Sequence, residues 1–167
     1  MNRRRQVFLF CLLSLAFIGC DRITKHIAKK ELMNRETLSY WHDTFRLTYA
    51  ENTGAALNLG DDLPPVASFW LLGMIPLVFL LFLAGYALRR SGRLNGLQLV
   101  SFALVFAGGM GNIIDRLLYH RHVTDFMNMG IHNLRTGIFN MADVCVMAGV
   151  TGLLIATIKS SIGSRNA

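Results

Sequence analysis

The chain has 167 residues, of which 53% are hydrophobic and 16% are charged, and its formal net charge is +7. A soluble domain of this length would interrupt its apolar residues every few positions, whereas here they form long blocks, which indicates an integral membrane protein. The basic residues cluster at the ends of these blocks, where they act as topology signals, so the positive charge does not predict nucleic-acid binding.

Four apolar segments are present, of which the second, third and fourth are each long enough to span a membrane, and they predict a single membrane domain that covers the whole chain, residues 1–167. The second segment contains Pro76, which can kink a helix and which neighbouring helices in a bundle tolerate. The fold class we expect is therefore an all-α membrane protein with four transmembrane helices. The expected helices are, approximately, residues 6–26, 66–88, 97–118 and 138–158.

The first apolar segment allows two interpretations. Three arginines, a short apolar run and Phe17-Ile18-Gly19-Cys20 resemble a bacterial lipoprotein signal peptide with its lipobox. Alternatively, the helix continues past Cys20, and Arg22 and Lys25 extend to the membrane interface. Composition alone leaves these two interpretations about even.

The loop that follows, about residues 27–65, contains two stretches that predict strands. Residues 37–41 and 45–49 are rich in β-branched and aromatic side chains, with Asp43 between them as a turn residue, so a small β-structure is expected. Asn52-Thr53-Gly54-Ala55-Ala56 comes next, a turn-like run of small residues that could bring backbone close to a ligand.

The distribution of lysine and arginine predicts the orientation in the membrane. Basic residues without acidic neighbours precede the first segment, join the second to the third and follow the fourth, so both termini should be cytoplasmic. The loop at residues 27–65 and the polar hairpin at residues 119–137 should then lie outside, although the first of these loops carries several cations of its own. The cytoplasmic cations are Arg3, Arg4, Arg5, Arg89, Arg90, Arg93, Lys159 and Arg165.

Polar residues of the third and fourth segments are expected at one level of the membrane. Asp115 lies about 27 Å along the third helix from Leu97, close to the outer edge of a hydrocarbon core of roughly 30 Å. Asp143 lies only about 7.5 Å into the fourth helix if that helix starts at Ile138. Both positions are near the outer leaflet, and the preceding run 108–111 is rich in glycine, which permits close helix approach.

These polar residues also share helix faces that should point into the protein. Asn112, Asp115 and Arg116 are spaced i, i+3 and i+4, and Asn140 and Asp143 are spaced i and i+3. Such faces are strongly disfavoured against lipid. The adjacent Asp115 and Arg116 suggest a structural ion pair or a hydrogen-bonding hub rather than a catalytic group.

Asp143 carries the strongest functional indication. A carboxylate in a membrane segment is energetically costly, and no basic residue one helical turn away could pair with it, so a functional role is the expected explanation. Asp125, in the hairpin, can fold back over Asp143, and two adjacent carboxylates can share a proton and activate a water molecule. This predicts aspartic peptidase chemistry. The cysteines and histidines show no ligand spacing, so neither a disulfide framework nor a metal site or other cofactor is expected.

Five short motifs, in order along nearly the whole chain, resemble those of lipoprotein signal peptidase, the bacterial type II signal peptidase family. The resemblance implies an intramembrane aspartic peptidase with four transmembrane helices and a small outer β-cradle. It also favours a retained first helix, because the first motif belongs after a spanning segment. The motifs are Asp21-Arg22-Ile23-Thr24-Lys25, Asn52-Thr53-Gly54-Ala55-Ala56, Gly111-Asn112-Ile113-Ile114-Asp115-Arg116, Val123-Thr124-Asp125-Phe126 and Phe139-Asn140-Met141-Ala142-Asp143.

The resemblance further implies a role for individual residues. The catalytic dyad would be Asp125 and Asp143, and the substrate would be a diacylglyceryl-modified prolipoprotein, cut just before its lipidated cysteine in the bacterial inner membrane. Membrane phospholipid would surround the protein, which we expect to be a monomer. The substrate-binding residues would be Asn52, Asn112, Arg116 and Asn140. The residues that support the site would be Asp21, Lys25, Gly54 and Asp115.

Three positions depart from the family pattern, which usually has Gln where Arg22 stands, an apolar or aromatic residue at Glu51 and Phe at Leu57. They put substrate range in doubt more than chemistry. One rival hypothesis is therefore a catalytically altered paralogue that binds lipoprotein precursors without cutting them. A second rival, a small transporter with Asp143 as a proton relay, is weaker, because polar residues at a single level provide no path across the membrane.

Overall fold

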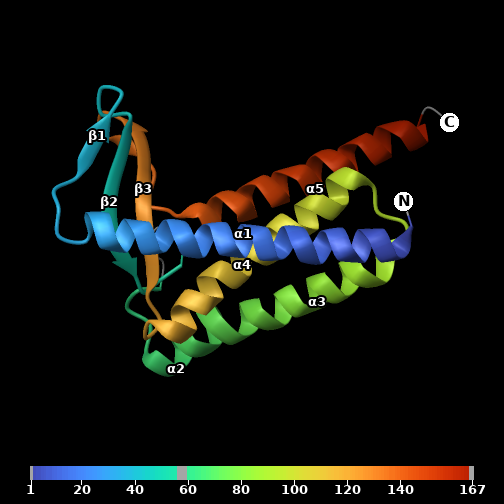
Figure 1. The fold of residues 1–167 in the computed structure, drawn as a ribbon, viewed down its shortest axis with the longest axis horizontal. Coiled ribbons are helices and arrows are strands. Elements are labelled where there is room, and N and C mark those ends of the chain that lie inside the picture. Colours follow the sequence, from blue (N-terminus) through green and yellow to red (C-terminus); the bar gives the residue numbers. More distant parts are fainter. Residues whose placement is uncertain (1, 56–59, 166–167) are drawn as a thin grey trace.

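The computed structural model describes residues 2–55 and 60–165, which form long helices with a small sheet across one end (Figure 1). Both chain termini lie at the opposite end of the helices. We call these two ends the sheet end and the basic end. In chain order the elements are α1 (Arg3–Leu32), β1 (Leu38–Tyr40), β2 (Phe45–Asn52), α2 (Pro65–Ser68), the π-helix η2 (Phe69–Met74), α3 (Ile75–Arg90), α4 (Gly96–Leu118), β3 (Val123–Ile131), β4 (Leu134–Arg135) and α5 (Met141–Arg165).

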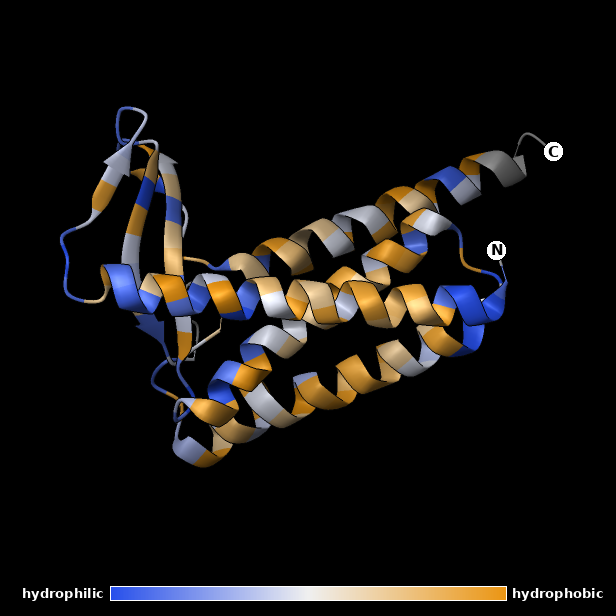
Figure 2. Cartoon of the chain, in the orientation of Figure 1, coloured by the Kyte–Doolittle hydropathy of each residue, from blue (hydrophilic) through white to orange (hydrophobic). Residues whose placement is uncertain are grey.

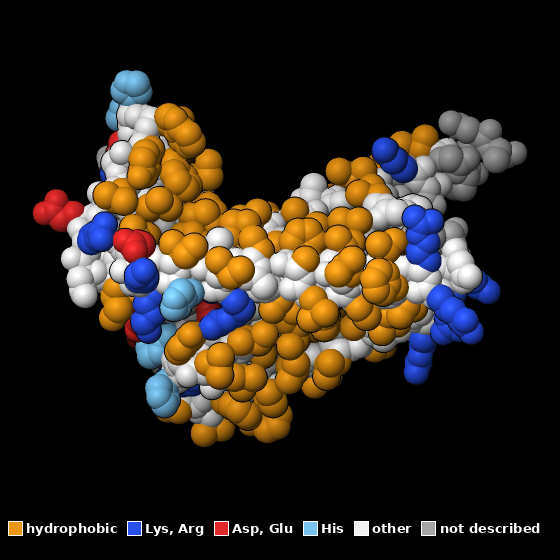
Figure 3. Space-filling model, in the orientation of Figure 1, with side chains coloured by type: hydrophobic (Ala, Val, Ile, Leu, Met, Phe, Trp, Pro, Cys, Tyr) orange, Lys and Arg blue, Asp and Glu red, His pale blue; other side chains and the backbone are white. Residues whose placement is uncertain are grey.

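Four helical stretches of the described chain are long and apolar enough to cross a membrane, as the sequence predicted. Hydrophobic residues cover the middle of these helices, and hydrophilic residues collect at the sheet and at the basic end (Figure 2). Lysine and arginine side chains are prominent at the basic end in the space-filling view (Figure 3). The stretches are Arg3–Leu32, Pro65–Arg90, Gly96–Leu118 and Met141–Ile162.

The second stretch consists of α2, η2 and α3 in succession and stays helical at its internal proline, Pro76. Pro76 lies in the first turn of α3, directly after η2, so its missing backbone N–H falls where the π-helix changes to an α-helix. Directly before it, the Ile75 N–H donates to the Trp70 carbonyl, an i to i−5 bond of the wider π turn. The chain therefore stays helical at the proline because the preceding turn changes its hydrogen-bonding pattern.

Helix α1 is longer than predicted, because it continues through Cys20 to Leu32 without interruption. Its last turns replace the first part of the expected loop. Ala28 and Leu32 are buried there in a small core together with Phe126 of β3. Packing against the sheet therefore stabilises helical residues that the hydropathy pattern had assigned to the loop.

The sheet confirms the two predicted strands and adds two more, in the antiparallel order β1-β2-β3-β4. Asp43 lies in the turn between β1 and β2, as expected, and its carboxylate accepts from Arg46. Strand β3 was not predicted, since residues 119–137 read as a polar hairpin. It pairs with β2 so that Ala50 lies opposite Asp125 and Asn52 opposite Val123. Asn52 and Asp125 are thus diagonal neighbours on one face.

Helix α4 is packed between the other three long helices by its run of glycines. A Cβ atom at Gly109 would lie 2.5 Å from Leu80 of α3, and one at Gly111 would lie 2.6 Å from Asp21 of α1. At Gly108 a Cβ would overlap the backbone of α5 near Val146. Each of the three glycines therefore faces a different helix, which confirms the close approach that the sequence predicted.

We expect Gly149→Ala to destabilise the α4–α5 contact, because its Cβ would lie 2.7 Å from the Ser101 carbonyl oxygen, which is backbone and cannot move aside easily. The cost should be about 1–3 kcal/mol. Thermal unfolding in detergent measures it. Gly85→Ala is the matched control, since no described atom lies within 4 Å of a Cβ there. Equal unfolding temperatures for the two variants would contradict the packing argument.

Candidate active site

Asp125 and Asp143 line one cavity of about 440 Å³ at the sheet end of the helices. Asp125 comes from β3 and Asp143 from the first turn of α5. The same cavity is lined by Asn112 and Arg116 of α4 and by Asn52 at the end of β2. The structure thus brings together the two aspartates and most of the polar residues that the motifs singled out.

Asp125 is buried, with 3% of its surface exposed. Its Oδ1 accepts from Asn140 Nδ2 at 2.6 Å, and its Oδ2 accepts from Asn52 Nδ2 at 3.1 Å. Burial raises the pKa of Asp125 from an ordinary 3.8 to about 6, with a smaller contribution from Asp143, against the opposing effect of the two amide donors. Asp125 therefore holds a proton more tightly than an exposed aspartate does.

Asp143 is part of the N-terminal cap of α5. Its Oδ2 accepts from the Asn140 backbone N–H at 3.0 Å, while Asn140 Oδ1 accepts from the Asp143 backbone N–H at 3.1 Å. This reciprocal pair is a capping box, which marks the start of a helix. The expected start at residue 138 was therefore wrong, and Asp143 lies in the first turn of α5 rather than inside the apolar stretch.

Asn140 joins the two aspartates. Its side chain is fully buried, and its Nδ2 donates both to Asp125 Oδ1 and, at 3.1 Å, to Asn112 Oδ1. Asn112 Nδ2 in turn donates to Asp143 Oδ1 at 2.9 Å. Two asparagine amides therefore fix the positions of both carboxylates relative to each other.

Lys25 sets the orientation of the Asn112 amide. Its Nζ lies 3.0 Å from Asn112 Oδ1, and an ammonium group can only donate. The oxygen of that amide must therefore face Lys25, so the NH₂ group faces Asp143. Lys25 is only 3% exposed, so the expectation that it extends to the membrane interface was wrong.

The charge of Lys25 is balanced by two buried aspartates. Its Nζ lies 2.9 Å from Asp21 Oδ2 and 2.9 Å from Asp115 Oδ2. Asp115 is also paired with Arg22, and it accepts from the Thr124 backbone N–H of β3 at 3.2 Å. Asp115 is therefore the hub that the sequence suggested, but its ion-pair partners come from α1 and not from the adjacent Arg116.

Asp21 carries the same network to α5, because its Oδ1 accepts from the Ala142 backbone N–H at 2.9 Å. Ala142 directly precedes Asp143. The cluster centred on Lys25 thus connects α1 to α4, β3 and α5, which carry Asn112, Asp125 and Asp143 of the cavity. Neither the direction of Lys25 nor this link was readable from spacing along the chain.

Arg116 closes the side of the cavity beneath the loop that follows β2. Its Nη2 donates to the Gly54 carbonyl at 2.7 Å, and the Gly54 N–H donates to Asn52 Oδ1 at 2.9 Å. The Asn52 side chain therefore accepts from this turn through its oxygen and donates to Asp125 through its nitrogen.

Where they are described, the positions that depart from the family pattern bond to residues other than Asp125 and Asp143. Arg22 is paired with Asp115 and donates to the Tyr119 hydroxyl at 3.0 Å, and Glu51 accepts from the Tyr49 hydroxyl at 2.7 Å. Leu57 lies outside the described residues. Within the described part of the chain, no group of three His, Cys, Asp or Glu side chains is arranged to hold a metal ion.

Comparison with known proteins assigns the family. The family profile described as "Signal peptidase (SPase) II" matches residues 13–159. The chain belongs to the signal peptidase II family. It is 31% identical to the lipoprotein signal peptidase of Borrelia turicatae over 99% of this chain and 98% of that protein. It is 30% identical to that of Gloeothece citriformis over 93% and 92% of the two chains.

Solved structures confirm the fold of this signal peptidase II family member. A bacterial membrane enzyme solved by the in meso method at 2.3 Å resolution is 27% identical to it, with a TM-score of 0.76 over 92% of this chain and 89% of that one. A second bacterial membrane enzyme, at 1.9 Å resolution, gives 27% identity and a TM-score of 0.74 over 90% and 93%. The protein is therefore a multi-pass membrane peptidase with four transmembrane helices and a small sheet.

Lys25→Met should destabilise the protein by about 3–5 kcal/mol, because it leaves the buried carboxylates of Asp21 and Asp115 without their shared cation. Lys30→Met is the matched control, since the Lys30 side chain is 74% exposed and should contribute little. Unfolding temperatures in one detergent compare the two. If both variants unfold at the temperature of the wild type, the cluster does not hold the helices together.

The raised pKa of Asp125 predicts a pH-dependent stability. Because the folded-state pKa of about 6 exceeds the ordinary 3.8, the folded protein binds this proton more tightly than the unfolded chain does. Stability should therefore fall as pH rises from about 4 to about 6, by at most about 3 kcal/mol, and the Asp125 contribution should stay constant above that. Unfolding of wild type and Asp125→Asn across this range isolates that contribution.

The expected result is that wild type loses stability relative to Asp125→Asn as pH rises. Asp62→Asn, at an exposed loop position, should follow the wild type throughout. A difference between wild type and Asp125→Asn that stays constant from pH 4 to pH 7 would show that the carboxyl titrates alike in the folded and unfolded states.

Proposed function

We propose that this protein is an aspartic endopeptidase that removes the signal peptide from diacylglyceryl-modified prolipoproteins, cutting just before the lipidated cysteine. Membership of the signal peptidase II family supports the substrate class. The observation that carries the mechanism is that Asp125 and Asp143 line one cavity and are joined through the buried amide of Asn140. Such a pair can share one proton and activate water.

In the first step, a water molecule held between the carboxyl groups attacks the scissile carbonyl carbon. In the proposed assignment Asp143 accepts a proton from the water, and Asp125, whose pKa is raised by burial, donates its proton to the carbonyl oxygen. The product is a neutral tetrahedral diol. The two aspartates have then exchanged protonation states.

In the second step the carbon–nitrogen bond breaks. Asp143 donates its proton to the departing nitrogen, and Asp125 takes back the hydroxyl proton as the new carboxyl group forms. The pair returns to its starting state with one proton on Asp125. Asn112 and Asn140 keep the two carboxyl groups in place during both steps through the hydrogen bonds described above.

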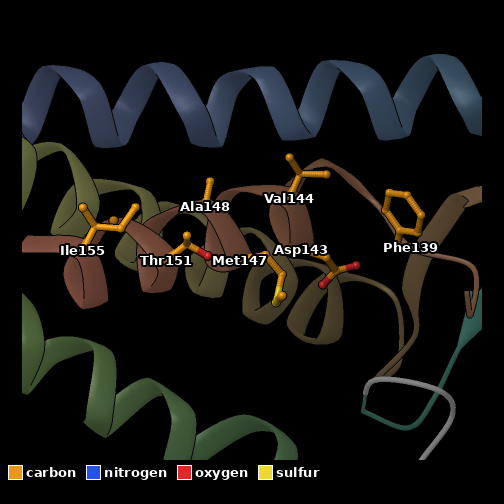
Figure 4. Close-up of a pocket in the computed structure, with 8 residues that line it drawn as sticks. Phe139, Asp143, Val144, Met147, Ala148, Thr151 and Ile155 are labelled. Carbon is orange, nitrogen blue, oxygen red and sulfur yellow. The ribbon is translucent and has the colours of Figure 1, made fainter. Parts of the chain in front are cut away.

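The surroundings of the dyad suit a substrate that lies partly in the membrane. A second groove, of about 630 Å³, starts at Asp143 and Phe139 and follows α5 to Ile155. Figure 4 shows its lining residues along α5, with Thr151 the only polar side chain labelled beyond Asp143. An apolar segment beside the cleavage site has an apolar surface to lie on there, which supports a signal peptide as one product.

The proposed orientation places the basic end in the cytoplasm and the sheet outside, in the bacterial inner membrane. The clusters of lysine and arginine at the basic end support it. The dyad would then lie near the outer leaflet, where a lipid-anchored cysteine presents its peptide bond. The anchor keeps that bond at a fixed depth, so binding energy from the lipid positions the reacting carbonyl.

The two active-site variants Asp125→Asn and Asp143→Asn should each lower kcat/KM by at least about 1000-fold, because neither can complete the proton exchange. The measurement is mass analysis of a diacylglyceryl-modified prolipoprotein after incubation with purified enzyme. Asp62→Asn serves as the control that loses an exposed carboxylate and should retain full activity.

Retained cleavage in either active-site variant would refute the dyad. An intact precursor that stays bound to the wild-type protein would instead favour the paralogue that binds without cutting. A cut at another bond would leave the chemistry in place and refute the proposed specificity.

A further inference from the structure

A small pocket lies between η2 and the end of α4. Two arginines line it, Arg116 from the last turn of α4 and Arg121 from the turn that follows. Its other walls are largely apolar and include Phe69, Met74 and Leu117. Its volume of about 30 Å³ admits one oxygen-sized group.

Each of the two arginines has one buried N–H donor without a hydrogen-bond partner. Arg116 Nε and Arg121 Nη1 are buried and have no hydrogen-bond partner among the described residues. A buried donor on a charged group without a partner costs free energy, so an acceptor is expected there. No Asp or Glu is among the residues that line the pocket; the aspartates that act on the charge of Arg116, Asp115, Asp125 and Asp143, lie outside it.

The position of the pocket favours an acceptor that belongs to a lipid. Arg121 follows the end of α4 by three residues, so it lies at the level where a spanning helix leaves the hydrocarbon core. Beside it, Phe69 and Trp70 form an edge-to-face pair and are 46% and 56% exposed, as aromatic residues are at membrane interfaces. Phosphate groups of phospholipids occupy this same level.

The surface below the pocket is suited to acyl chains. Leu71, Ile75 and Val78 follow one another along η2 and α3, and all three are at least half exposed. A molecule that combines an anionic head with apolar chains can therefore place its head at the two arginines and its chains along this helix.

We propose that this pocket binds the phosphate group of an anionic phospholipid, with Arg116 Nε and Arg121 Nη1 donating to one phosphate oxygen. Arginine suits this role because its N–H groups match phosphate oxygens in charge and geometry. Only one oxygen enters the pocket, and the remainder of the phosphate stays in the headgroup layer. The binding does not depend on the proposed peptidase chemistry.

Lipid binding here would also act on the active site through Arg116. The same guanidinium donates to the Gly54 carbonyl from Nη2 and would donate to the phosphate from Nε. An anion at Nε would therefore restrain the same guanidinium group that holds Gly54. The lipid becomes a positioning element for the loop that follows β2.

The test is a titration of the purified full-length protein in detergent with phosphatidylglycerol, phosphatidylcholine or inorganic phosphate, read out as thermal stabilisation and as bound lipid by native mass spectrometry. Wild type should be stabilised most by phosphatidylglycerol, because the choline cation opposes the two arginines. In Arg121→Gln the half-saturating phosphatidylglycerol concentration should rise about tenfold.

Arg89→Gln is the matched control, since it removes an exposed arginine at the basic end and tests for unspecific charge attraction. Arg121→Lys keeps the charge and should bind more tightly than Arg121→Gln, which separates lost binding from lost folding. Equal titrations for Arg121→Gln and Arg89→Gln would overturn the site. Equal stabilisation of wild type by inorganic phosphate would overturn a lipid as the source of the phosphate.

Discussion

The buried ion cluster around Lys25 is the interaction on which the remaining structure depends. A lone lysine inside a membrane protein would be costly, but Lys25 is enclosed by Asp21, Asp115 and the oxygen of Asn112. Those partners come from α1 and α4, and they bond in turn to the backbone of β3 and α5. Charge balance within this cluster thus determines how four elements meet.

The same cluster also fixes the direction of the hydrogen bonds in the site. The Lys25 ammonium group can only donate, so the Asn112 amide has one permitted orientation, with its oxygen toward Lys25 and its nitrogen toward Asp143. A site built only from asparagines and aspartates would allow amides to flip. A fixed amide orientation determines which carboxylate oxygens accept a hydrogen bond, and so which oxygens remain free to share a proton.

The sequence predicted what depends on local composition and missed what depends on distant contacts. The long apolar blocks determine the four helices, and β-branched residues determine β1 and β2. Strand β3 was missed because its residues are stabilised as a strand by pairing with β2, which is distant in the sequence. The start of α5 was placed too early because hydropathy includes Ile138 and Phe139, whereas the Asn140 and Asp143 spacing already contained the pattern of a cap.

The way α5 begins has a consequence for how negative charge could be stabilised during peptide hydrolysis. Helix N-termini commonly offer free backbone N–H groups to an oxyanion. Here the Ala142 N–H is taken by Asp21 and the Asp143 N–H by Asn140. These two amides are closed to the substrate. In the proposed mechanism the charge of an oxyanion is instead avoided by proton transfer from a carboxyl group, a chemistry for which an aspartate pair is suited.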